Sequence, residues 1–448
     1  MSLRALELPN VRHFVRFRIF FNARYYYPIF AVLFIDYGLT LEQFTTLNVL
    51  WAVTIVLAEV PSGALADVIG RRTLLLIGAS LMCLEMLVLL VAPIGGGTLT
   101  LILFAINRVA SGLAEAMVSG ADEALTYDTL QRDGDPGEWT ALLEFLGKRI
   151  ALVMGFVMVI GALFYDPNFV NVVTSRLGFE VPSDWLLRVP IALTLLHGFV
   201  ALYSAWAMKE VEPEGHAPVE RPLRRLGKSF VRVWGAMKWL ASNRFLLFVV
   251  LSGLIIDSVA RQYVILNSEY YRLIGLPEFS YGFLSAALAA AGFLFAKFNR
   301  YLADRHAPLS NLLILSAILV FGLVGAAFHL PYVGVVFVPF IVLMFSSVSF
   351  LQSTYLNREA DSSMRATLLS FRGLASNLGL ALASQLYAVL IWSLKQNYPD
   401  QSGDELQQTV FADALAWFAP SYLVLLGLVL LGGRLFIRRR DKAIQVPA

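Results

Sequence analysis

The sequence has few charged residues for its length. Only 15% of its 448 residues are charged and 58% are hydrophobic, whereas about 25% of the residues of a soluble domain are charged. This deficit excludes an ordinary soluble protein and indicates a chain that lies largely within a membrane. The chain also has a single cysteine, Cys83, which excludes a disulfide framework.

The sequence also lacks patterns that are typical of enzymes and metal sites. It contains neither an H-E-x-x-H motif nor a G-x-S-x-G motif, and its five histidines and one cysteine form no cluster in the apolar segments. We therefore expect no enzymatic activity, no cofactor, no metal and no nucleic-acid partner. A non-transporting membrane receptor is a further alternative, but it would need large domains outside the membrane, and no loop is long enough for one.

Long apolar runs dominate the chain. A helix needs about 20 apolar residues to cross a bilayer, and the runs predict an all-α membrane protein with twelve spanning helices in two bundles of six. The first six lie near residues 15–37, 43–66, 73–92, 99–122, 141–165 and 187–207. The second six lie near residues 245–270, 280–303, 309–329, 332–354, 366–394 and 413–437. The predicted parts are an N-terminal bundle (1–207), a cytoplasmic linker (208–244), a C-terminal bundle (245–437) and a basic tail (438–448).

The basic residues indicate the orientation in the membrane. Most of the 35 Lys and Arg fall on one side of the predicted spans, and the loops of the other side hold only Arg176, Arg188, Arg272 and Lys395. The positive-inside rule therefore predicts that both termini are cytoplasmic. In the linker, apolar residues recur with a helical period over 223–240 among basic ones. This pattern predicts an amphipathic helix on the inner leaflet, with a solvated linker helix as the alternative.

A ten-residue polar string joins the second and third runs: Gly63-Ala64-Leu65-Ala66-Asp67-Val68-Ile69-Gly70-Arg71-Arg72. Its two glycines permit close helix packing and a tight turn. The string resembles the cytoplasmic loop between helices 2 and 3 of the major facilitator superfamily. Part of it recurs between the eighth and ninth runs as Leu302-Ala303-Asp304-Arg305. The resemblance implies the fold of that superfamily, with two homologous six-helix halves.

The resemblance also implies that this string is a gate. We expect Asp67 to lie near the positive N-terminus of the eleventh helix, or to pair with Arg71 or Arg149. Such contacts would close the two halves on the cytoplasmic side. The predicted gating residues are Gly63, Asp67, Gly70, Arg71 and Arg72, with Asp304 and Arg305 in the second half.

Ionisable residues inside the apolar runs mark the candidate substrate site, because a charge at mid-bilayer costs about 2.5–3.5 kcal/mol on insertion scales. Arg24 and Asp257 lie about 15 and 18 Å into the first and seventh runs, at 1.5 Å per residue. The resemblance implies that these two helices line the central cavity, so both residues are candidate substrate ligands. Arg261 lies four residues after Asp257 on the same helical face and could neutralise it, which would leave Arg24 as the unpaired cation.

Arg108 and Glu115 form a second candidate pair, seven residues apart on one face of the fourth run. Arginine does not deprotonate in proteins, so Glu115 or Asp257 is the expected proton carrier, and Arg108 is a further candidate substrate ligand. Three polar or aromatic residues of the first and seventh runs could also contact the cargo: Asn22, Tyr25 and Tyr263. Packing or interfacial roles are the alternative for each of these three.

The surplus of intramembrane arginine favours an anionic or zwitterionic organic cargo. We therefore expect a secondary transporter of the bacterial cytoplasmic membrane that moves a small organic solute by alternating access. Coupling to protons or another ion, contact with membrane lipids and a monomeric state are also expected. Efflux of cationic drugs by antiport is the main alternative. Antiporters of the superfamily usually carry a G-P-x-x-G-G-type motif in helix 5, and the fifth run has no proline between Gly155 and Gly161.

Overall fold

A computed structural model of the chain describes residues 4–211, 231, 235, 237–240, 242–359 and 362–437, apart from the side chains at 67, 293–294, 359, 362–367, 369 and 433–437. The described residues form helices joined by turns and short loops, which confirms the predicted all-α class. Among them are 11 helical segments long and apolar enough to cross a membrane. These segments correspond to the second to twelfth predicted spans. The linker helix predicted at 223–240 lies almost wholly outside the described residues.

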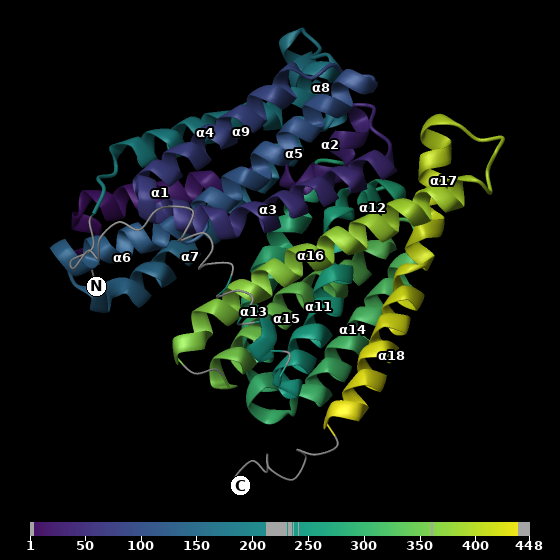
Figure 1. Cartoon of the computed structure of the whole chain (residues 1–448). Helices are drawn as coiled ribbons and strands as arrows, with labels where there is room; N and C mark the ends of the chain where they lie inside the picture. Colours follow the sequence, from purple (N-terminus) through teal and green to yellow (C-terminus); the bar gives the residue numbers. More distant parts are fainter. Residues whose placement is uncertain are drawn as a thin grey trace. The chain divides into compact units, whose positions relative to one another are not determined.

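The chain divides into two compact units, and each is described by itself. Unit 1 comprises Met1–Ser229 and Leu276–Ala290, and unit 2 comprises Phe230–Gly275 and Ala291–Ala448. The main helices of unit 1 are α1 (Pro9–Asn22), η2 (Tyr27–Ile29), α2 (Phe30–Asp36), α3 (Leu41–Ile69), α4 (Arg71–Val91), α5 (Thr98–Val118), α6 (Ala121–Asp133), α7 (Trp139–Tyr165), α8 (Pro167–Thr174) and α9 (Ser183–Ala207) (Figure 1). Those of unit 2 are α11 (Arg244–Ile265), α12 (Asn267–Leu273), α14 (Pro308–Ala327), α15 (Val338–Glu359), α16 (Ser362–Lys395), α17 (Gly403–Ala416) and α18 (Phe418–Ile437). Helix α13 (Ser280–Arg305) begins in unit 1 and continues in unit 2. The predicted four-part domain boundaries stay a prediction.

The first predicted span, 15–37, is a broken helix. Helix α1 ends at Asn22, whose Nδ2 donates to the carbonyl of Arg18 at 2.7 Å. Such side-chain bonds compete with the backbone pattern of a helix, and Pro28 disfavours α-helical geometry in the residue before it. Arg24 therefore lies in a non-helical stretch between α1 and η2. The break explains why this span is not among the uninterrupted helices that could cross a membrane.

Two further helices are discontinuous. In unit 2, α11 and α12 are separated at Leu266, so the seventh predicted span is also interrupted. In unit 1, α5 and α6 are separated at Gly120, whose φ of +75° is a conformation that glycine adopts without strain. The helical segment that corresponds to the fourth predicted span runs from Thr98 to Asp133, beyond the predicted end near residue 122.

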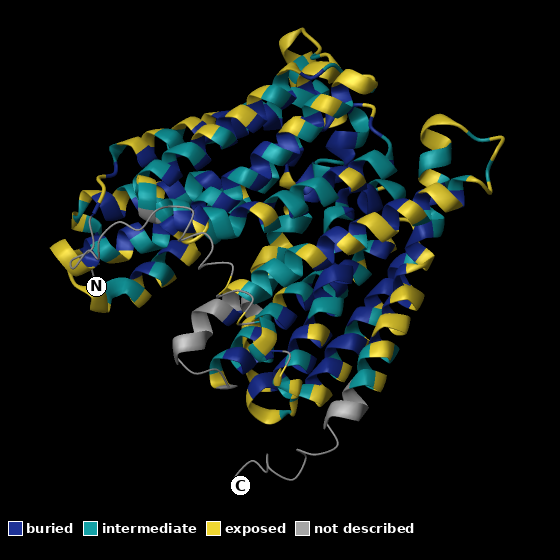
Figure 2. Ribbon diagram, viewed as in Figure 1, coloured by how far each residue is buried: buried dark blue, intermediate teal, exposed yellow. Residues whose placement is uncertain are grey.

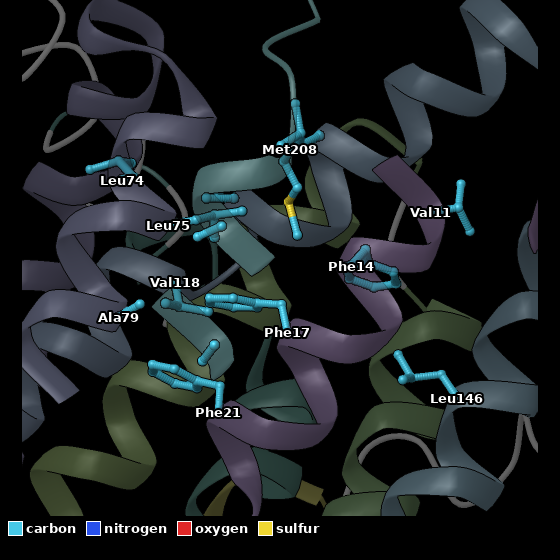
Figure 3. Packing of buried hydrophobic residues seen from close by; sticks show 14 of the residues in the cluster. Val11, Phe14, Phe17, Phe21, Leu74, Leu75, Ala79, Val118, Leu146 and Met208 are labelled. Atoms are coloured by element: carbon cyan, nitrogen blue, oxygen red, sulfur yellow. The ribbon is translucent and has the colours of Figure 1, made fainter. Parts of the chain in front are cut away.

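Aromatic residues of α1 anchor this helix in the core of unit 1. Phe14, Phe17 and Phe21 share one helical face, and each is at most 1% exposed. They belong to a cluster with residues of α4, α5 and α9, in which Leu75 and Val118 are also buried (Figure 3). Between helices in a bilayer, close van der Waals packing of this kind stabilises the contact. The packing therefore fixes the end of α1 from which Arg24 extends.

Large apolar side chains remain exposed along the helices of both units (Figure 2). On α9 they recur at Leu196, Phe199, Tyr203 and Trp206, with exposed fractions between 48% and 63%. A spacing of three or four residues places these side chains on one face of the helix. Such faces are unusual in soluble proteins and fit contact with lipid.

Candidate functional site

Arg24 is the centre of a buried charge cluster in unit 1. The residue is 1% exposed, and its Nη1 forms an ion pair with Glu85 of α4 and donates to the Tyr26 hydroxyl at 3.1 Å. Its Nη2 lies 3.4 Å from Oε1 of Glu115 on α5. The expectation that Arg24 is an unpaired cation is therefore wrong, because two carboxylates share its guanidinium.

We call Arg24, Glu85 and Glu115 the Arg24 cluster. Its two acids differ in accessibility, since the side chain of Glu85 is 0% exposed and that of Glu115 is 37% exposed. With both acids ionised, the cluster has two negative charges and one positive charge. A proton on Glu115 would make it neutral without disturbing the buried ion pair. Glu115 is thus the more accessible of the two acids of this cluster.

Arg108 of α5 does not pair with Glu115. Its Nε donates to Oδ1 of Asn107 at 2.9 Å, and its guanidinium carbon lies 5.2 Å from the ring centres of Phe30 and Phe34. Its Nη2 is buried and has no hydrogen-bond partner in the part of the chain that the structure describes. Cation–π contacts of this kind stabilise a guanidinium without neutralising it. Arg108 is therefore a buried cation that, among the described residues, has no acidic partner.

The structure does not bring Asn22 and Tyr25 to the Arg24 cluster. Asn22 binds the backbone of its own helix. Tyr25 lies against α9, where its hydroxyl is 3.3 Å from Nε2 of His197 and its backbone N–H donates to Thr194 at 3.0 Å. Both residues thus contribute to the packing and shape of the break.

Asp257 and Arg261 form an ion pair in unit 2. Arg261 Nη2 donates to both carboxylate oxygens of Asp257, at 2.8 and 2.7 Å. Its Nη1 donates to Oδ1 of Asn377 at 3.1 Å, and its guanidinium carbon lies 5.2 Å from the ring centre of Phe345. The ion pair that the i,i+4 spacing allows is therefore present. Further contacts of Arg261 reach Phe345 on α15 and Asn377 on α16.

A second arginine lies close to this pair. Arg372 of α16 donates to the carbonyl oxygen and the hydroxyl of Ser349, at 2.8 and 3.1 Å, and it is within electrostatic reach of Asp257. We call Asp257, Arg261 and Arg372 the Asp257 cluster. It has two guanidinium groups and one carboxylate, so its charge imbalance is opposite to that of the Arg24 cluster.

Tyr263 belongs to an aromatic core of unit 2. It is 1% exposed, and its ring centre lies 5.6 Å from that of Tyr270 and 6.0 Å from that of Phe418. Its hydroxyl has no hydrogen-bond partner among the described residues. The residue therefore packs against α12 and α18, and within the described residues its hydroxyl forms no hydrogen bond with the Asp257 cluster.

The predicted gating string forms the turn between α3 and α4. Gly70 has a φ of +89°, and the backbone N–H groups of Arg71 and Arg72 donate to the carboxylate of Glu210 at 3.0 and 2.9 Å. A carboxylate at this position satisfies the free N–H groups of a helix N-terminus and interacts favourably with its dipole. A Cβ atom on Gly70 would lie 2.6 Å from Oε2 of Glu210, so the glycine leaves room for this cap.

The arginines of the string bind within unit 1. Arg71 forms an ion pair with Asp128 of α6, and Nη2 of Arg72 donates to the carbonyl of Trp206 at the end of α9, at 2.8 Å. Together with Glu210, these contacts connect the α3–α4 turn to α6 and to the segment after α9.

The equivalent residues of unit 2 also make local contacts. Asp304 lies 3.0 Å from Nη2 of Arg358 on α15. The guanidinium carbon of Arg305 lies 5.7 Å from the ring centre of Tyr301, one turn earlier on α13. The gating role predicted for these residues stays a prediction.

Two expectations for the string have different outcomes. The side chain of Asp67 lies outside the described residues, so its expected contact with the eleventh helix, Arg71 or Arg149 stays a prediction. In the described structure, the guanidinium of Arg71 binds Asp128. A Cβ atom on Gly63 would meet no described atom within 4 Å. The close packing that we expected at Gly63 is therefore absent from the described structure.

Two residues of these clusters, Glu85 and Arg372, and one at the α3–α4 turn, Glu210, were not predicted as site residues. Glu85 had a usable signal, because an acid in the middle of an apolar run needs a buried partner, and Arg24 and Arg108 are the arginines deep within the spans of the first half. Arg372 lies near the start of its predicted span, where arginine is ordinary. Glu210 has no local motif, since its role depends on the proximity of a turn about 140 residues earlier in the chain, a fold-level property.

Comparison with known proteins agrees with this architecture. The family model of the Major Facilitator Superfamily matches residues 13–384, and no curated protein matches the sequence. Among solved structures, a bacterial homologue of the human lysosomal transporter Spinster, inward-facing and occupied, has a TM-score of 0.66 at 15% identity, covering 100% of this chain and 98% of that chain.

Two further transporters are similarly close in structure. The nucleoside transporter NupG has a TM-score of 0.65 at 13% identity, covering 96% of this chain and 99% of that chain. The D-xylose–proton symporter has a TM-score of 0.62 at 12% identity, covering 95% and 97%. At these identities the likeness establishes the fold alone. With the family match over most of its length, this chain belongs to the Major Facilitator Superfamily.

Proposed function

We propose that the protein is a proton-coupled secondary transporter of a small organic solute with an anionic or zwitterionic group, and that it works by alternating access. The observation that carries the proposal is the shared guanidinium of Arg24, bound by a sealed acid and an accessible acid. One arginine cannot neutralise two carboxylates, so one of the two acids of the cluster can bind a proton. Operation as a monomer in the bacterial cytoplasmic membrane, in contact with its lipids, is part of the proposal.

Glu115 is the proposed proton carrier. Its carboxylate is 37% exposed and 3.4 Å from Arg24, so a bound proton would remove one of the two charges that hold the arginine. The guanidinium would then depend on Glu85 alone, and the contact between α5 and the break after α1 would weaken. This change would link proton uptake to the non-helical stretch between α1 and η2.

The anionic cargo is supported by two arginines that lack an acid of their own among the described residues. Arg108 has a buried nitrogen without a hydrogen-bond partner, and Arg372 shares Asp257 with Arg261. A carboxylate or phosphate group would supply the missing counter-charge, since bidentate arginine–carboxylate bonds are among the strong hydrogen bonds of proteins.

Efflux of a cationic compound is the second candidate. It is favoured by the pairing of Arg24 and Arg261 with acids, which leaves the accessible Glu115 and the 39% exposed ring of Tyr27 as groups that a cation would prefer. The two candidates predict opposite ligand preferences.

Ligand-induced thermal shifts on the purified full-length protein distinguish these candidates. The probes are mono- and dicarboxylates, amino acids and sugar phosphates on one side, and quaternary ammonium compounds on the other. We expect stabilisation by members of the first group only. Stabilisation by the ammonium compounds alone would replace the anionic proposal with cationic efflux.

Uptake of the stabilising compound into proteoliposomes, with and without a pH gradient, then tests coupling. Glu115→Gln should remove the dependence on the gradient while counterflow exchange at equal pH persists, because the neutral amide imitates the protonated acid. Glu123→Gln serves as a control, since it removes another partly exposed acid of the same unit. A gradient dependence that survives in Glu115→Gln would refute the assignment.

A further inference from the structure

One end of α9 combines aromatic and basic residues on an outward face. Tyr203 and Trp206 are 54% and 63% exposed, and their ring centres are 6.1 Å apart. Leu196 and Phe199 continue the same face towards the middle of the helix and are also exposed. Tyrosine and tryptophan with an apolar surface on one side are typical of the boundary between lipid headgroups and acyl chains.

Basic residues of α1 lie on one flank of this aromatic pair. The ring of His13 contacts that of Tyr203 at a centroid distance of 6.3 Å. Burial, together with the positive charges of Arg16 and Arg12, lowers the pKa of His13. Arg12 and Arg16 are exposed, and neither side chain makes a hydrogen bond or ion pair within the described residues. Two unmatched guanidinium groups therefore stand beside the aromatic residues.

Further basic residues lie near the C-terminal end of α9. Helix α4 packs against α9 (Figure 1), and Nη2 of its Arg72 binds the carbonyl of Trp206. The Nε of Arg72 has no hydrogen-bond partner among the described residues. Lys209 follows directly after α9 and is exposed. Glu210, the acid next to Lys209 in the sequence, accepts hydrogen bonds from the backbone N–H groups of α4.

We propose that this surface is a binding site for an anionic phospholipid. We call it the α9 lipid site, formed by Arg12, Arg16, Arg72, Lys209, Tyr203 and Trp206. The phosphate would lie among the arginines of α1 and α4, and the acyl chains would follow the face of Leu196 and Phe199. A lipid fits better than a free anion, because the site joins unmatched positive charge to an apolar surface. The proposal does not depend on the identity of the cargo.

The site is tested with the full-length protein in mild detergent, by native mass spectrometry and thermal unfolding with added phosphatidylglycerol or phosphatidylcholine. We expect phosphatidylglycerol to remain bound and to raise the unfolding temperature, and phosphatidylcholine to do neither. Arg12→Gln with Arg16→Gln should weaken phosphatidylglycerol binding by about 30-fold, because each basic residue near an anionic lipid surface contributes roughly fivefold. Arg12→Lys with Arg16→Lys should retain binding.

Lys297→Gln with Arg300→Gln is the matched control. Both residues are exposed on α13 and lie far from α9 in the sequence, and their removal changes the net charge by the same amount. This variant should bind phosphatidylglycerol as the unchanged protein does. Equal losses in the two double variants would overturn the site, and so would equal stabilisation by the two lipids. Displacement of the lipid by millimolar inorganic phosphate would point to a simple anion site instead.

Discussion

At the scale of single residues, Glu85 decides the electrostatic state of Arg24. Both groups are fully buried and bonded to each other, and taking a charge out of water is tolerated only when a partner is present. Glu115 is a weaker partner, at 3.4 Å and partly exposed. We therefore assign to Glu85 the structural half of the cluster and to Glu115 the exchangeable half.

This division predicts different stabilities for two matched variants. Glu85→Gln leaves a buried guanidinium without its main counter-charge, and breaking a buried pair in this way costs about 3–5 kcal/mol. Glu115→Gln removes a partly exposed charge and leaves the Arg24–Glu85 pair in place, so it should cost less than Glu85→Gln. Thermal and denaturant unfolding in detergent, followed by tryptophan fluorescence, measures both. Equal destabilisation of the two variants would contradict the division.

The sequence predicted the positions of these charges better than their partners. The depth of Arg24 and Asp257 follows from counting residues along an apolar run, and the pairing of Asp257 with Arg261 follows from the helical period. The partner of Arg24 comes from a helix about 60 residues later, so it depends on tertiary packing. Arg108 shows the same limit, because its actual neighbours are aromatic rings of α2 and not the acid on its own helix face.

At the scale of elements, the α3–α4 turn depends on one glycine. Gly70 has a positive φ and no room for a Cβ atom beside Glu210, whereas Gly63, seven residues earlier, has open space around its Cα. The two glycines of one string therefore have different roles. The Glu210 cap on α4 requires glycine at position 70, whereas the described structure around Gly63 leaves room for a Cβ atom.

Alanine substitutions test this difference directly. Gly70→Ala combines a backbone conformation restricted essentially to glycine (φ +89°, ψ +151°), which costs about 1–3 kcal/mol for other residues, with displacement of the Glu210 carboxylate. Gly63→Ala should be neutral or slightly stabilising, because alanine favours a helix interior by about 1 kcal/mol over glycine. Unfolding temperatures of the two variants give the comparison. A loss of stability in Gly63→Ala as large as in Gly70→Ala would refute it.

The helices themselves were largely predictable, and their interruptions were not. Apolar length identified the second to twelfth spans, since only hydrophobic helices of that length satisfy their backbone groups in a bilayer. The break after Asn22 depends on a single side-chain hydrogen bond and on Pro28, within a run long enough to be read as one continuous span. No proline or glycine next to Leu266 indicates the interruption between α11 and α12, so this interruption was not predicted either.

At the scale of the whole molecule, the orientation in the membrane is an expectation that rests on the basic residues. The chain offers a convenient test, because its single cysteine, Cys83, is buried. Arg132→Cys, at the end of α6, and Ser402→Cys, before α17, introduce exposed thiols in segments predicted on opposite sides. A membrane-impermeant maleimide added to intact cells should label Ser402→Cys and leave Arg132→Cys unlabelled until the membrane is opened. The reverse pattern would invert the predicted topology.

The two units carry charge clusters of opposite imbalance, and this difference predicts how ligand and proton responses separate. In the Asp257 cluster, the hydrogen bonds of Arg372 within the described residues go to the carbonyl and hydroxyl of Ser349, while Arg261 keeps Asp257 neutralised. Removing Arg372 therefore removes the excess positive charge and leaves the ion pair intact. If this excess attracts the cargo, Arg372→Gln should lose anion-induced thermal stabilisation, and Arg372→Lys should retain part of it.

The same variant should leave proton coupling untouched, because Glu115 belongs to the other cluster. Residual uptake by Arg372→Gln should still depend on the pH gradient, whereas Glu115→Gln should bind the anion and lose that dependence. A tenfold change in affinity corresponds to about 1.4 kcal/mol. A ten- to hundredfold loss of anion affinity in Arg372→Gln would therefore correspond to the loss of one or two good charge-assisted hydrogen bonds. Unchanged anion affinity in Arg372→Gln would exclude this cluster as the anion site and direct attention to Arg108, whose unpartnered nitrogen is the other candidate.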